Sequence, residues 1–506
     1  MNFKLNIIAA GLLVSALLTS CTKLDEEKFG SLSPDNYYQD EQAALSSVVG
    51  VYQLLSYNVD IGDPWRMKEF STDEFIVPGR ASGGWYDQSN IDLLKHVQNA
   101  DNNTVARAWT QIFQEIGTAN AVMESLQASP NKDKLKALIA ETRALRAYGY
   151  FFAMDNWGNV PLVTVARIDP KDLPKTSSRA EVYKFIETEM LAAVADLPSI
   201  KDVNRTSYYP RFTKESVYTA LAYMYLNAQV YTGTAQWQKV VDNCNLVINT
   251  GAYSLMPKVI DNFTSTSQAS STEIISAFTK DPTQNAGNNQ FILYTQNGLD
   301  QLKYNLPFGP ANGYSTTQAA LDKYENADVR KNMIEYGPQF YQDGVTPLKY
   351  ANGTQLVLIP VQDIVAAQDN EGYKVLKYTP LGAKWSGFNA DNDLILERYS
   401  NVLLMKAEAI FRQSGSTTEV VSLVNQVRTR SGASSISSVT LQVLEEERMR
   451  EFLWEGCRRT DMIRFGTFFT GTWAFKTTQT ADFRKIYPIP NAQIKANPNL
   501  VQNPGY

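Results

Sequence analysis

Apolar residues recur at intervals of three and four through most of the first half of the chain, and this periodicity constrains the fold more than any other feature. Between residues 103 and 127 the apolar positions share one face of a helix. They are Val105, Ala108, Ile112, Ile116, Ala119, Met123 and Leu126. A second stripe of the same kind follows directly, at Leu135, Leu138, Ile139, Leu145 and Phe152. Two consecutive amphipathic helices predict a helical hairpin.

Three more amphipathic stretches follow in the same half. One covers residues 179–197 and is stopped by Pro198. The others cover residues 217–228 and 237–248, and Gly251 is expected to cap the last of them. Successive helix pairs of this size indicate stacked hairpins of the tetratricopeptide kind. The expected fold class is therefore mainly α, with an α-solenoid-like scaffold.

The helical period fades between about residue 254 and residue 392, where Asn, Gln, Gly, Thr and Tyr predominate. The runs at 273–278 and 355–361 are typical of short strands. We interpret this segment as a loop-rich insertion subdomain.

Helical periodicity returns at Tyr399. Ser416 with Glu419 resembles a capping box and predicts a helix that ends at about Arg430. The helical scaffold is thus expected to occupy residues of about 35–253 and 393–470. Because no boundary resembles a flexible linker, we expect residues 21–506 to form one body.

Charge and histidine content exclude several classes of function. The 506 residues include 47 basic and 52 acidic side chains, and a net charge of −5 without a basic cluster argues against nucleic acid as a partner. The single histidine, His96, excludes a metal site built from several histidines. It follows Leu93 and Leu94, so we expect a structural imidazole. No metal or cofactor is predicted, although the sequence leaves a structural Ca²⁺ open.

The first 20 residues predict a signal peptide: Lys4 gives the positive start, and an apolar run from Ile7 to Leu18 precedes Cys21. The ending LLTSC resembles the lipobox of bacterial lipoproteins, which implies that Cys21 carries a lipid anchor. Cys244 lies on the apolar stripe of residues 237–248, so we expect a buried, unreactive thiol.

Residues 444–465 contain a group of carboxylates that invites a catalytic interpretation. Glu447 and Glu451 lie one helical turn apart, and paired carboxylates can act as general acid and base. However, they alternate with arginines at helical spacing, which favours structural ion pairs. Cys457 lies beside Arg458, a setting that lowers a thiol pKa, but no second residue completes a nucleophile pattern.

The segment ERMREFLWEGCRRTDMIRFG at residues 447–466 resembles the C-terminal signature of the SusD/RagB family of outer-membrane nutrient-binding lipoproteins. The terminus YPIPNAQIKANPNLVQNPGY is similar to the end of family members. Segments at 141–163 and 398–432 also match, with small departures at Gly149 and Met154.

The resemblance implies four tetratricopeptide-like helix pairs that support a less regular, ligand-binding subdomain. It implies a non-catalytic lipoprotein that passes oligosaccharide to a SusC-like TonB-dependent transporter. The acidic residues after Cys21 resemble the export tag of Bacteroidetes lipoproteins, which implies an outer-membrane protein facing outside.

Glycan binding requires aromatic faces for sugar rings and polar side chains for hydroxyls. Residues 62–90 are rich in both, and the resemblance places part of the ligand surface there. Trp85 is the first candidate for stacking, and the alternative is that it packs as an ordinary core aromatic. The remaining candidates for ligand contact are Tyr86, Asp73, Arg80, Asn90, Tyr304 and Trp385, with Tyr294, Phe308 and Tyr314 as further aromatics of the insertion.

Two other functions remain open from the sequence. One is peptide binding, as in RagB-like uptake lipoproteins. The other is a surface glycoside hydrolase, which needs two carboxylates about 5 to 9.5 Å apart in an aromatic cleft, and no pair of loop carboxylates stands out for it.

Overall fold

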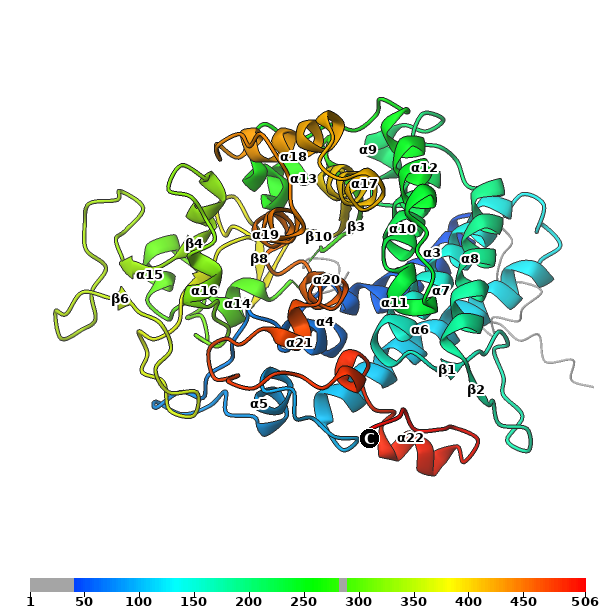
Figure 1. The fold of residues 1–506 in the computed structure, drawn as a ribbon, viewed down its shortest axis with the longest axis horizontal. Coiled ribbons are helices and arrows are strands. Elements are labelled where there is room, and N and C mark those ends of the chain that lie inside the picture. The colour runs from blue at the N-terminus through cyan, green and yellow to red at the C-terminus, as the bar shows by residue number, and fades with distance from the viewer. Residues whose placement is uncertain (1–40, 282–288) are drawn as a thin grey trace, which may run out of the picture.

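Long helices packed side by side form the right-hand part of the molecule in Figure 1. The computed structural model describes residues 41–281 and 289–506. The long helices of the first half are α3 (Glu41–Leu55), α6 (Asn103–Ala128), α7 (Lys136–Trp157), α8 (Arg179–Asp196), α10 (Lys214–Leu226) and α12 (Trp237–Ile248). α6 packs on α7, α7 on α8, and α10 on α12. The helical hairpin predicted from the apolar periodicity is confirmed.

The chain returns to this scaffold in its second half. The helices there are α17 (Tyr399–Ser414), α18 (Thr418–Arg430), α19 (Leu441–Phe452) and α20 (Arg458–Phe465). α17 packs on α12 and on α18, so helices from both halves form one stack. The mainly α fold class is confirmed. The shorter helices are α4 (Asp63–Glu69), α5 (Gln88–Leu94), α9 (Arg205–Tyr208), α11 (Ala228–Thr232), α13 (Ser265–Gln268), α21 (Thr467–Thr470) and α22 (Asn491–Ala496).

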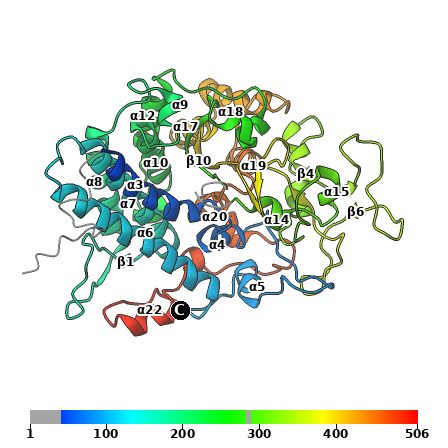
Figure 2. The same cartoon turned by 180° about the vertical axis from the view of Figure 1, so that it is seen from behind.

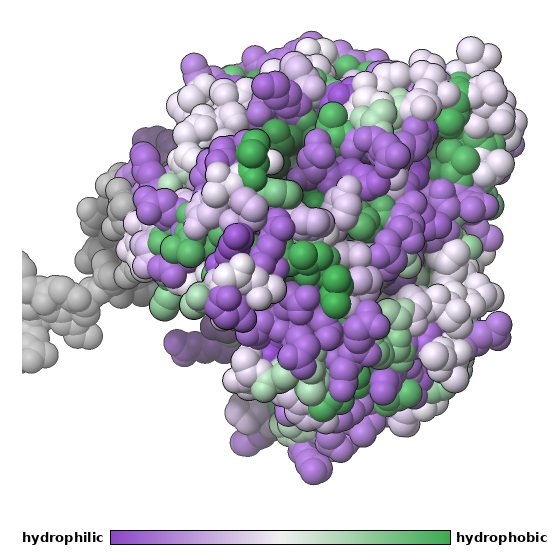
Figure 3. All heavy atoms as spheres, turned by 90° about the vertical axis from the view of Figure 1, so that its left-hand side faces the viewer, coloured by the Kyte–Doolittle hydropathy of each residue, from purple (hydrophilic) through white to green (hydrophobic). Residues whose placement is uncertain are grey.

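Short helices and two-residue strands occupy the opposite end of the molecule (Figures 1 and 2). The helices are α14 (Phe291–Thr295), α15 (Asp300–Tyr304) and α16 (Gln318–Leu321). The antiparallel strand pairs are β4 (Ile334–Glu335) with β7 (Lys374–Val375), β5 (Gly337–Pro338) with β6 (Val357–Leu358), and β8 (Trp385–Ser386) with β9 (Asn389–Ala390). Seen from this end, the surface is mainly hydrophilic, with apolar side chains in small separate groups (Figure 3).

One longer strand pair joins the two ends of this irregular region. β3 (Ile274–Phe278) pairs antiparallel with β10 (Leu394–Arg398), so that Phe278 lies opposite Leu394. The chain therefore leaves the scaffold and re-enters it at one place. β3 confirms the strand predicted at 273–278, and β6 lies within the run at 355–361. A further short pair joins β1 (Val160–Pro161) to β2 (Thr176–Ser177).

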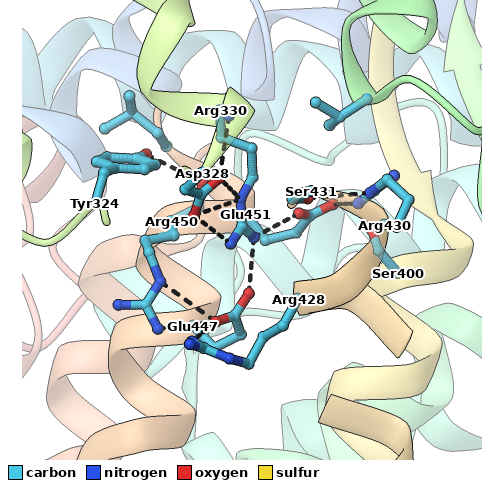
Figure 4. A network of polar contacts seen from close by, with 12 residues as sticks. Tyr324, Asp328, Arg330, Ser400, Arg428, Arg430, Ser431, Glu447, Arg450 and Glu451 are labelled. Atoms are coloured by element: carbon cyan, nitrogen blue, oxygen red, sulfur yellow. Dashed lines mark hydrogen bonds and ion pairs between the residues drawn. The ribbon is translucent and has the colours of Figure 1, made fainter. Parts of the chain in front are cut away.

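Buried ion pairs hold α19 against its neighbours (Figure 4). Arg330 Nη1 lies 2.7 Å from Glu447 Oε1 and 2.9 Å from Glu451 Oε2, and all three side chains are fully buried. Glu451 also accepts from Arg398 and Arg430 at 2.7 and 2.6 Å. Burial alone would raise the pKa of Glu451, but these arginines bring it well below its usual value. The two carboxylates are structural, as the alternation with arginine predicted.

The expected capping box at Ser416 and Glu419 is wrong. Thr417 caps α18, because its hydroxyl accepts from the backbone N–H of Val420 at 3.3 Å. The Ser416 hydroxyl accepts instead from the backbone N–H of Val439 at 2.8 Å. A sequence with adjacent Ser and Thr offers two caps, and the tertiary contact decides between them. The predicted end of this helix at Arg430 is confirmed.

The predicted signal peptide, Cys21 and the acidic stretch lie outside the described residues. Within residues 41–281 and 289–506, no helix is both long and apolar enough to span a membrane.

Candidate functional site

Three aromatic side chains from separate segments meet at the junction between α4, α14 and the loop that follows α15. Trp85 lies edge-on to Tyr294 and to Tyr314, with ring centroids 5.3 and 5.5 Å apart. Tyr294 stacks on Tyr314 at 5.6 Å with an interplanar angle of 18°. Tyr314 is buried, whereas Trp85 and Tyr294 are half-buried and reach the surface. We call these three residues the aromatic platform.

The loop backbone holds Trp85 in an unusual conformation. Trp85 has φ of 63°, and it follows Gly83 and Gly84, which also have positive φ. Its indole lies directly on Gly313, where a Cβ would come within 2.5 Å of the ring. Its Nε1 donates to Ala311 O at 2.7 Å. Because non-glycine residues rarely adopt positive φ, a strained aromatic at the surface is a sign of a functional position.

Arg80 lies beneath this platform and binds backbone carbonyls. Its Nε donates to Asn312 O at 2.7 Å, and its Nη1 donates to Gln368 O and Glu371 O at 3.0 and 2.7 Å. Only 5% of the residue is exposed, and burial lowers the pKa of its guanidinium to about 10. In this structure Arg80 therefore positions the loop on which Trp85 rests.

Charged side chains of α4 border the platform. The Arg66 guanidinium lies 5.9 Å from the ring centroid of Tyr294 and 6.0 Å from that of Tyr314. Asp63 pairs with Arg66 at 3.5 Å and accepts two hydrogen bonds from Arg107, at 2.8 and 3.0 Å. This border offers donors to ligand hydroxyls, because half of the Arg107 side chain is exposed. Sequence reasoning missed Asp63 and Arg66, although their spacing of three residues on a helix is typical of an ion pair.

Tyr86 lies just before α5, and Asn90 lies in the first turn of that helix. Tyr86 is 54% exposed, and its hydroxyl donates to Gln88 Oε1 at 2.9 Å. Asn90 is half-buried and accepts from the Thr104 hydroxyl at 3.3 Å. Tyr86 directly follows Trp85 in the sequence, and Asn90 lies five residues after it.

The other sequence candidates lie elsewhere. Asp73 forms two 2.7 Å hydrogen bonds with Arg458. Tyr304 donates to Glu335 at 2.9 Å. Trp385 packs edge-on against Phe308 at 5.2 Å, in a separate apolar cluster that includes Leu306. Of the further aromatics of the insertion, Tyr294 and Tyr314 contact Trp85.

His96, Cys244 and Cys457 are structural. His96 Nε2 lies 2.9 Å from Ser71 O, which can only accept, so Nε2 carries the proton and Nδ1 accepts from the Thr480 hydroxyl at 2.6 Å. Burial lowers the pKa of His96 to about 3, so the ring is neutral. Burial raises the pKa of Cys244 and of Cys457. The expectation that Arg458 lowers the pKa of Cys457 is therefore wrong, because desolvation outweighs the nearby positive charge.

Possible metal ligands do not converge in the part of the chain that the structure describes, where no three His, Cys, Asp or Glu side chains are grouped to hold an ion.

Comparison with known proteins gives consistent matches along the chain. A model of the SusD family matches residues 249–506, and a model described as "Starch-binding associating with outer membrane" matches residues 28–226. The starch-binding protein SusD of Bacteroides thetaiotaomicron is 26% identical over 498 residues, which cover 87% of this chain and 85% of that protein.

Solved structures share the fold. A SusD-like carbohydrate-binding protein from Bacteroides fragilis superimposes with a TM-score of 0.77 at 19% identity, covering 92% of this chain and 100% of that one. Surface glycan-binding protein A from Bacteroides thetaiotaomicron, in complex with laminarihexaose, gives a TM-score of 0.75 at 22% identity, covering 92% and 99% of the two chains.

Proposed function

The chain belongs to the SusD family, and from this premise we propose that it captures oligosaccharide at the cell surface and delivers it to a SusC-like TonB-dependent transporter. In this proposal the protein is a lipoprotein of the outer membrane, anchored through Cys21 and facing outside. It performs no covalent step. Two relatives support glycan as the ligand: SusD is named for starch, and surface glycan-binding protein A was solved with laminarihexaose.

The observation that carries the proposal is the aromatic platform with its charged border. Half-buried Trp85 and Tyr294 offer ring surface to the C–H faces of a pyranose, and Arg66 and Arg107 offer donors to its hydroxyls. Tyr86 and Asn90 extend the polar edge. We propose these six residues as the ligand-contact set, in place of Asp73, Tyr304 and Trp385, which the fold assigns to other contacts.

A glycan array followed by calorimetry tests the proposal. We expect Trp85→Ala to weaken binding of the best array ligand by about 1–3 kcal/mol, the usual cost of removing an interface aromatic. Tyr336→Ala is the matched control, because Tyr336 is an exposed aromatic, 43% accessible, in the irregular region. Equal affinities of the two variants would remove Trp85 from the site.

Peptide binding is the second candidate function. The charged border of Asp63, Arg66 and Arg107 suits peptide backbone and side chains as well as sugar hydroxyls. Calorimetry against mixed peptides as well as oligosaccharides separates the two: binding of peptides alone contradicts the glycan proposal. A glycoside hydrolase is the third candidate, and release of new reducing ends from array glycans by the purified protein would support it.

The anchor is tested by Cys21→Ala. Loss of the lipidated thiol leaves the mature chain with no covalent attachment to the membrane, so we expect the variant in the soluble fraction and the parent in the outer-membrane fraction. The proposed transporter partner is tested by copurification: we expect the parent protein to copurify with a TonB-dependent transporter. Membrane retention of Cys21→Ala would contradict the anchor.

A further inference from the structure

A fully buried lysine holds the segment that carries Tyr314 of the platform. Lys374 is the first residue of β7 and is 0% exposed. Its Nζ donates to Ser315 Oγ at 3.1 Å and to Tyr314 O at 3.4 Å. Both acceptors are uncharged, and an amine buried against uncharged acceptors costs free energy. A gain elsewhere in the molecule is therefore expected to offset this cost.

Lys374 supplies the donor for the carbonyl group of Tyr314. Among residues 41–281 and 289–506, no other backbone or side-chain donor reaches Tyr314 O. The Tyr314 N–H donates to Tyr294 O at 2.8 Å, so the main chain of Tyr314 is bonded to the platform on one side and to Lys374 on the other. Because a buried carbonyl is normally paired, the amine fixes the position of this main chain.

Ser315 connects Lys374 to Arg80. The Ser315 side chain is buried, and its Oγ accepts from Lys374 Nζ and from Arg80 Nη2, the latter at 3.5 Å. Gly372 provides the necessary space, because a Cβ at this position would come within 2.2 Å of Ser315 Oγ. Three segments that are distant in the sequence, at residues 80, 315 and 374, therefore meet at one hydroxyl.

The surroundings of Lys374 favour a neutral amine. Burial lowers the pKa of Lys374 well below its usual value, and the charge of Arg80 lowers it further. Asp300 and Glu335 act in the opposite direction. A neutral amine needs no carboxylate partner, which agrees with the hydroxyl and carbonyl that it contacts.

Lys377 is a matched comparison, three residues further along the chain. It is 3% exposed, and burial lowers the pKa of its amine as well. Its Nζ donates to Glu451 O at 3.1 Å and to Leu453 O at 2.8 Å, and it pairs with Glu455. These partners belong to α19 and the turn after it. The two lysines are therefore alike in burial but hold different parts of the molecule.

We propose that Lys374 is a positioning residue of the ligand site, whose amine holds Tyr314 and thereby sets the rings of Trp85 and Tyr294 in the geometry that receives the ligand. This inference rests on the proposed glycan-binding function. Lys374 is fully buried and acts without contacting the ligand. Both half-buried rings pack on Tyr314, so a displaced Tyr314 moves both of them.

Fluorine NMR of protein labelled with 5-fluorotryptophan tests the positioning directly, with the Trp85 resonance assigned through Trp85→Phe. We expect Lys374→Met, which keeps an unbranched side chain and removes the donor, to shift the Trp85 resonance of the ligand-free protein. Lys374→Gln retains a donor and is expected to restore the parent position of the resonance. Lys377→Met is expected to leave the resonance unchanged, although it also loses buried hydrogen bonds.

Calorimetry with maltohexaose and laminarihexaose, titrated separately, measures the effect on binding. We expect Lys374→Met to weaken binding between about 2-fold and about 30-fold, the usual range for a residue that acts on a site without contacting the ligand. Lys374→Gln is expected to recover most of the affinity, and Lys377→Met to bind as the parent does. Urea unfolding of the variants shows whether the two methionine substitutions cost similar stability.

The outcomes separate the two proposals. A stationary Trp85 resonance and an unchanged affinity in Lys374→Met overturn the inference and leave the proposed function standing. Equal affinity losses in Lys374→Met and Lys377→Met also overturn it, because they reflect a general loss of stability. A Trp85 resonance that shifts in Lys374→Met alone, in a protein that binds neither saccharide, supports the positioning role and contradicts the proposed function.

Ser315→Ala provides a second test that applies even if Lys374→Met does not fold. It removes the hydroxyl that Lys374 and Arg80 share, so we expect the Trp85 resonance to shift and saccharide binding to weaken. A Trp85 resonance that stays at the parent position in folded Ser315→Ala overturns the inference.

Discussion

Glu115 is a single side chain whose ionisation is set mainly by its burial. It lies on α6 with 0% exposure, and neither carboxylate oxygen has a partner among residues 41–281 and 289–506. It packs against α7 at Gly149, where a Cβ would come within 1.8 Å of Glu115 Oε2. The absence of a side chain at Gly149 thus makes room for a buried carboxyl. Burial raises the pKa of Glu115 well above its usual value, although Arg146 opposes this.

The raised pKa of Glu115 predicts a pH-dependent stability. In the unfolded chain the Glu115 carboxyl ionises above about pH 4.3, whereas the folded protein keeps it protonated. The protonated Glu115 therefore contributes fully to the free energy of unfolding below that pH, and this contribution is lost as the pH rises. We expect Glu115→Gln to be more stable than the parent at about pH 8, with the difference narrowing toward about pH 4.

Urea unfolding across that pH range measures the difference. Asp133→Asn, at an exposed site before α7, serves as the control and should show little pH-dependent change. A Glu115→Gln difference that does not vary with pH would show that the carboxyl is already ionised in the folded protein.

At the scale of elements, the short helix η3 (Val329–Met333) is attached to α19 through buried ion pairs. Arg330 is fully buried and bonds to Asp328, Glu447 and Glu451 at once. α19 in turn reaches β10 through Arg398. The helix α19 therefore links the irregular region to the scaffold through the carboxylates of Glu447 and Glu451.

We expect Arg330→Ala to lower the free energy of unfolding by about 3–5 kcal/mol, because it leaves three buried carboxylates without their shared partner. Lys485→Ala removes an exposed pair with Asp482 and is expected to change stability by less than about 0.5 kcal/mol. Chemical denaturation of both variants makes the comparison. Similar values for the two would mean that the network contributes nothing beyond a surface ion pair.

Across the whole molecule, the candidate site exists only because distant segments converge. Arg80 binds carbonyls at 312, 368 and 371, which lie 232 to 291 residues further along the chain. Asn312 adds a further hydrogen bond between these segments, since its Nδ2 donates to Asp369 O at 2.8 Å. We call these hydrogen bonds of Arg80 and Asn312 the clamp. Trp85 rests on the loop that this clamp holds.

A double-mutant cycle tests whether Arg80 acts through Trp85. Lysine cannot reproduce the several fixed donors of the guanidinium, so we expect Arg80→Lys to weaken oligosaccharide binding. In the Trp85→Ala background the same change is expected to cause no further loss, because the supported platform is already gone. Calorimetry measures both effects. Additive losses would show instead that Arg80 contacts the ligand, as the sequence suggested.

Sequence patterns within one helix predicted the features that depend on residues close together in the chain. The stripe at residues 103–127 matches α6 within a residue, since helix formation follows apolar spacing. The inert Cys244 and the ion-paired Glu447 were also predictable, because each lies in a helix whose neighbours are visible in sequence. The platform was predicted only in part: Trp85 stood out for its glycines and polar neighbours, while nothing near Tyr294 or Tyr314 in the chain marked them as its partners.

The amino-acid sequence by itself determined the helical scaffold and the family signature, and it excluded a metal site built from several histidines, because periodicity, motif and composition are properties of the chain in one dimension. Only the tertiary structure decided that Asp73 serves Arg458, 385 residues away, and that Arg80 supports a loop. Loop residues show no helical or strand periodicity in the sequence. Their contact partners are therefore set by where the packed scaffold brings the loops together.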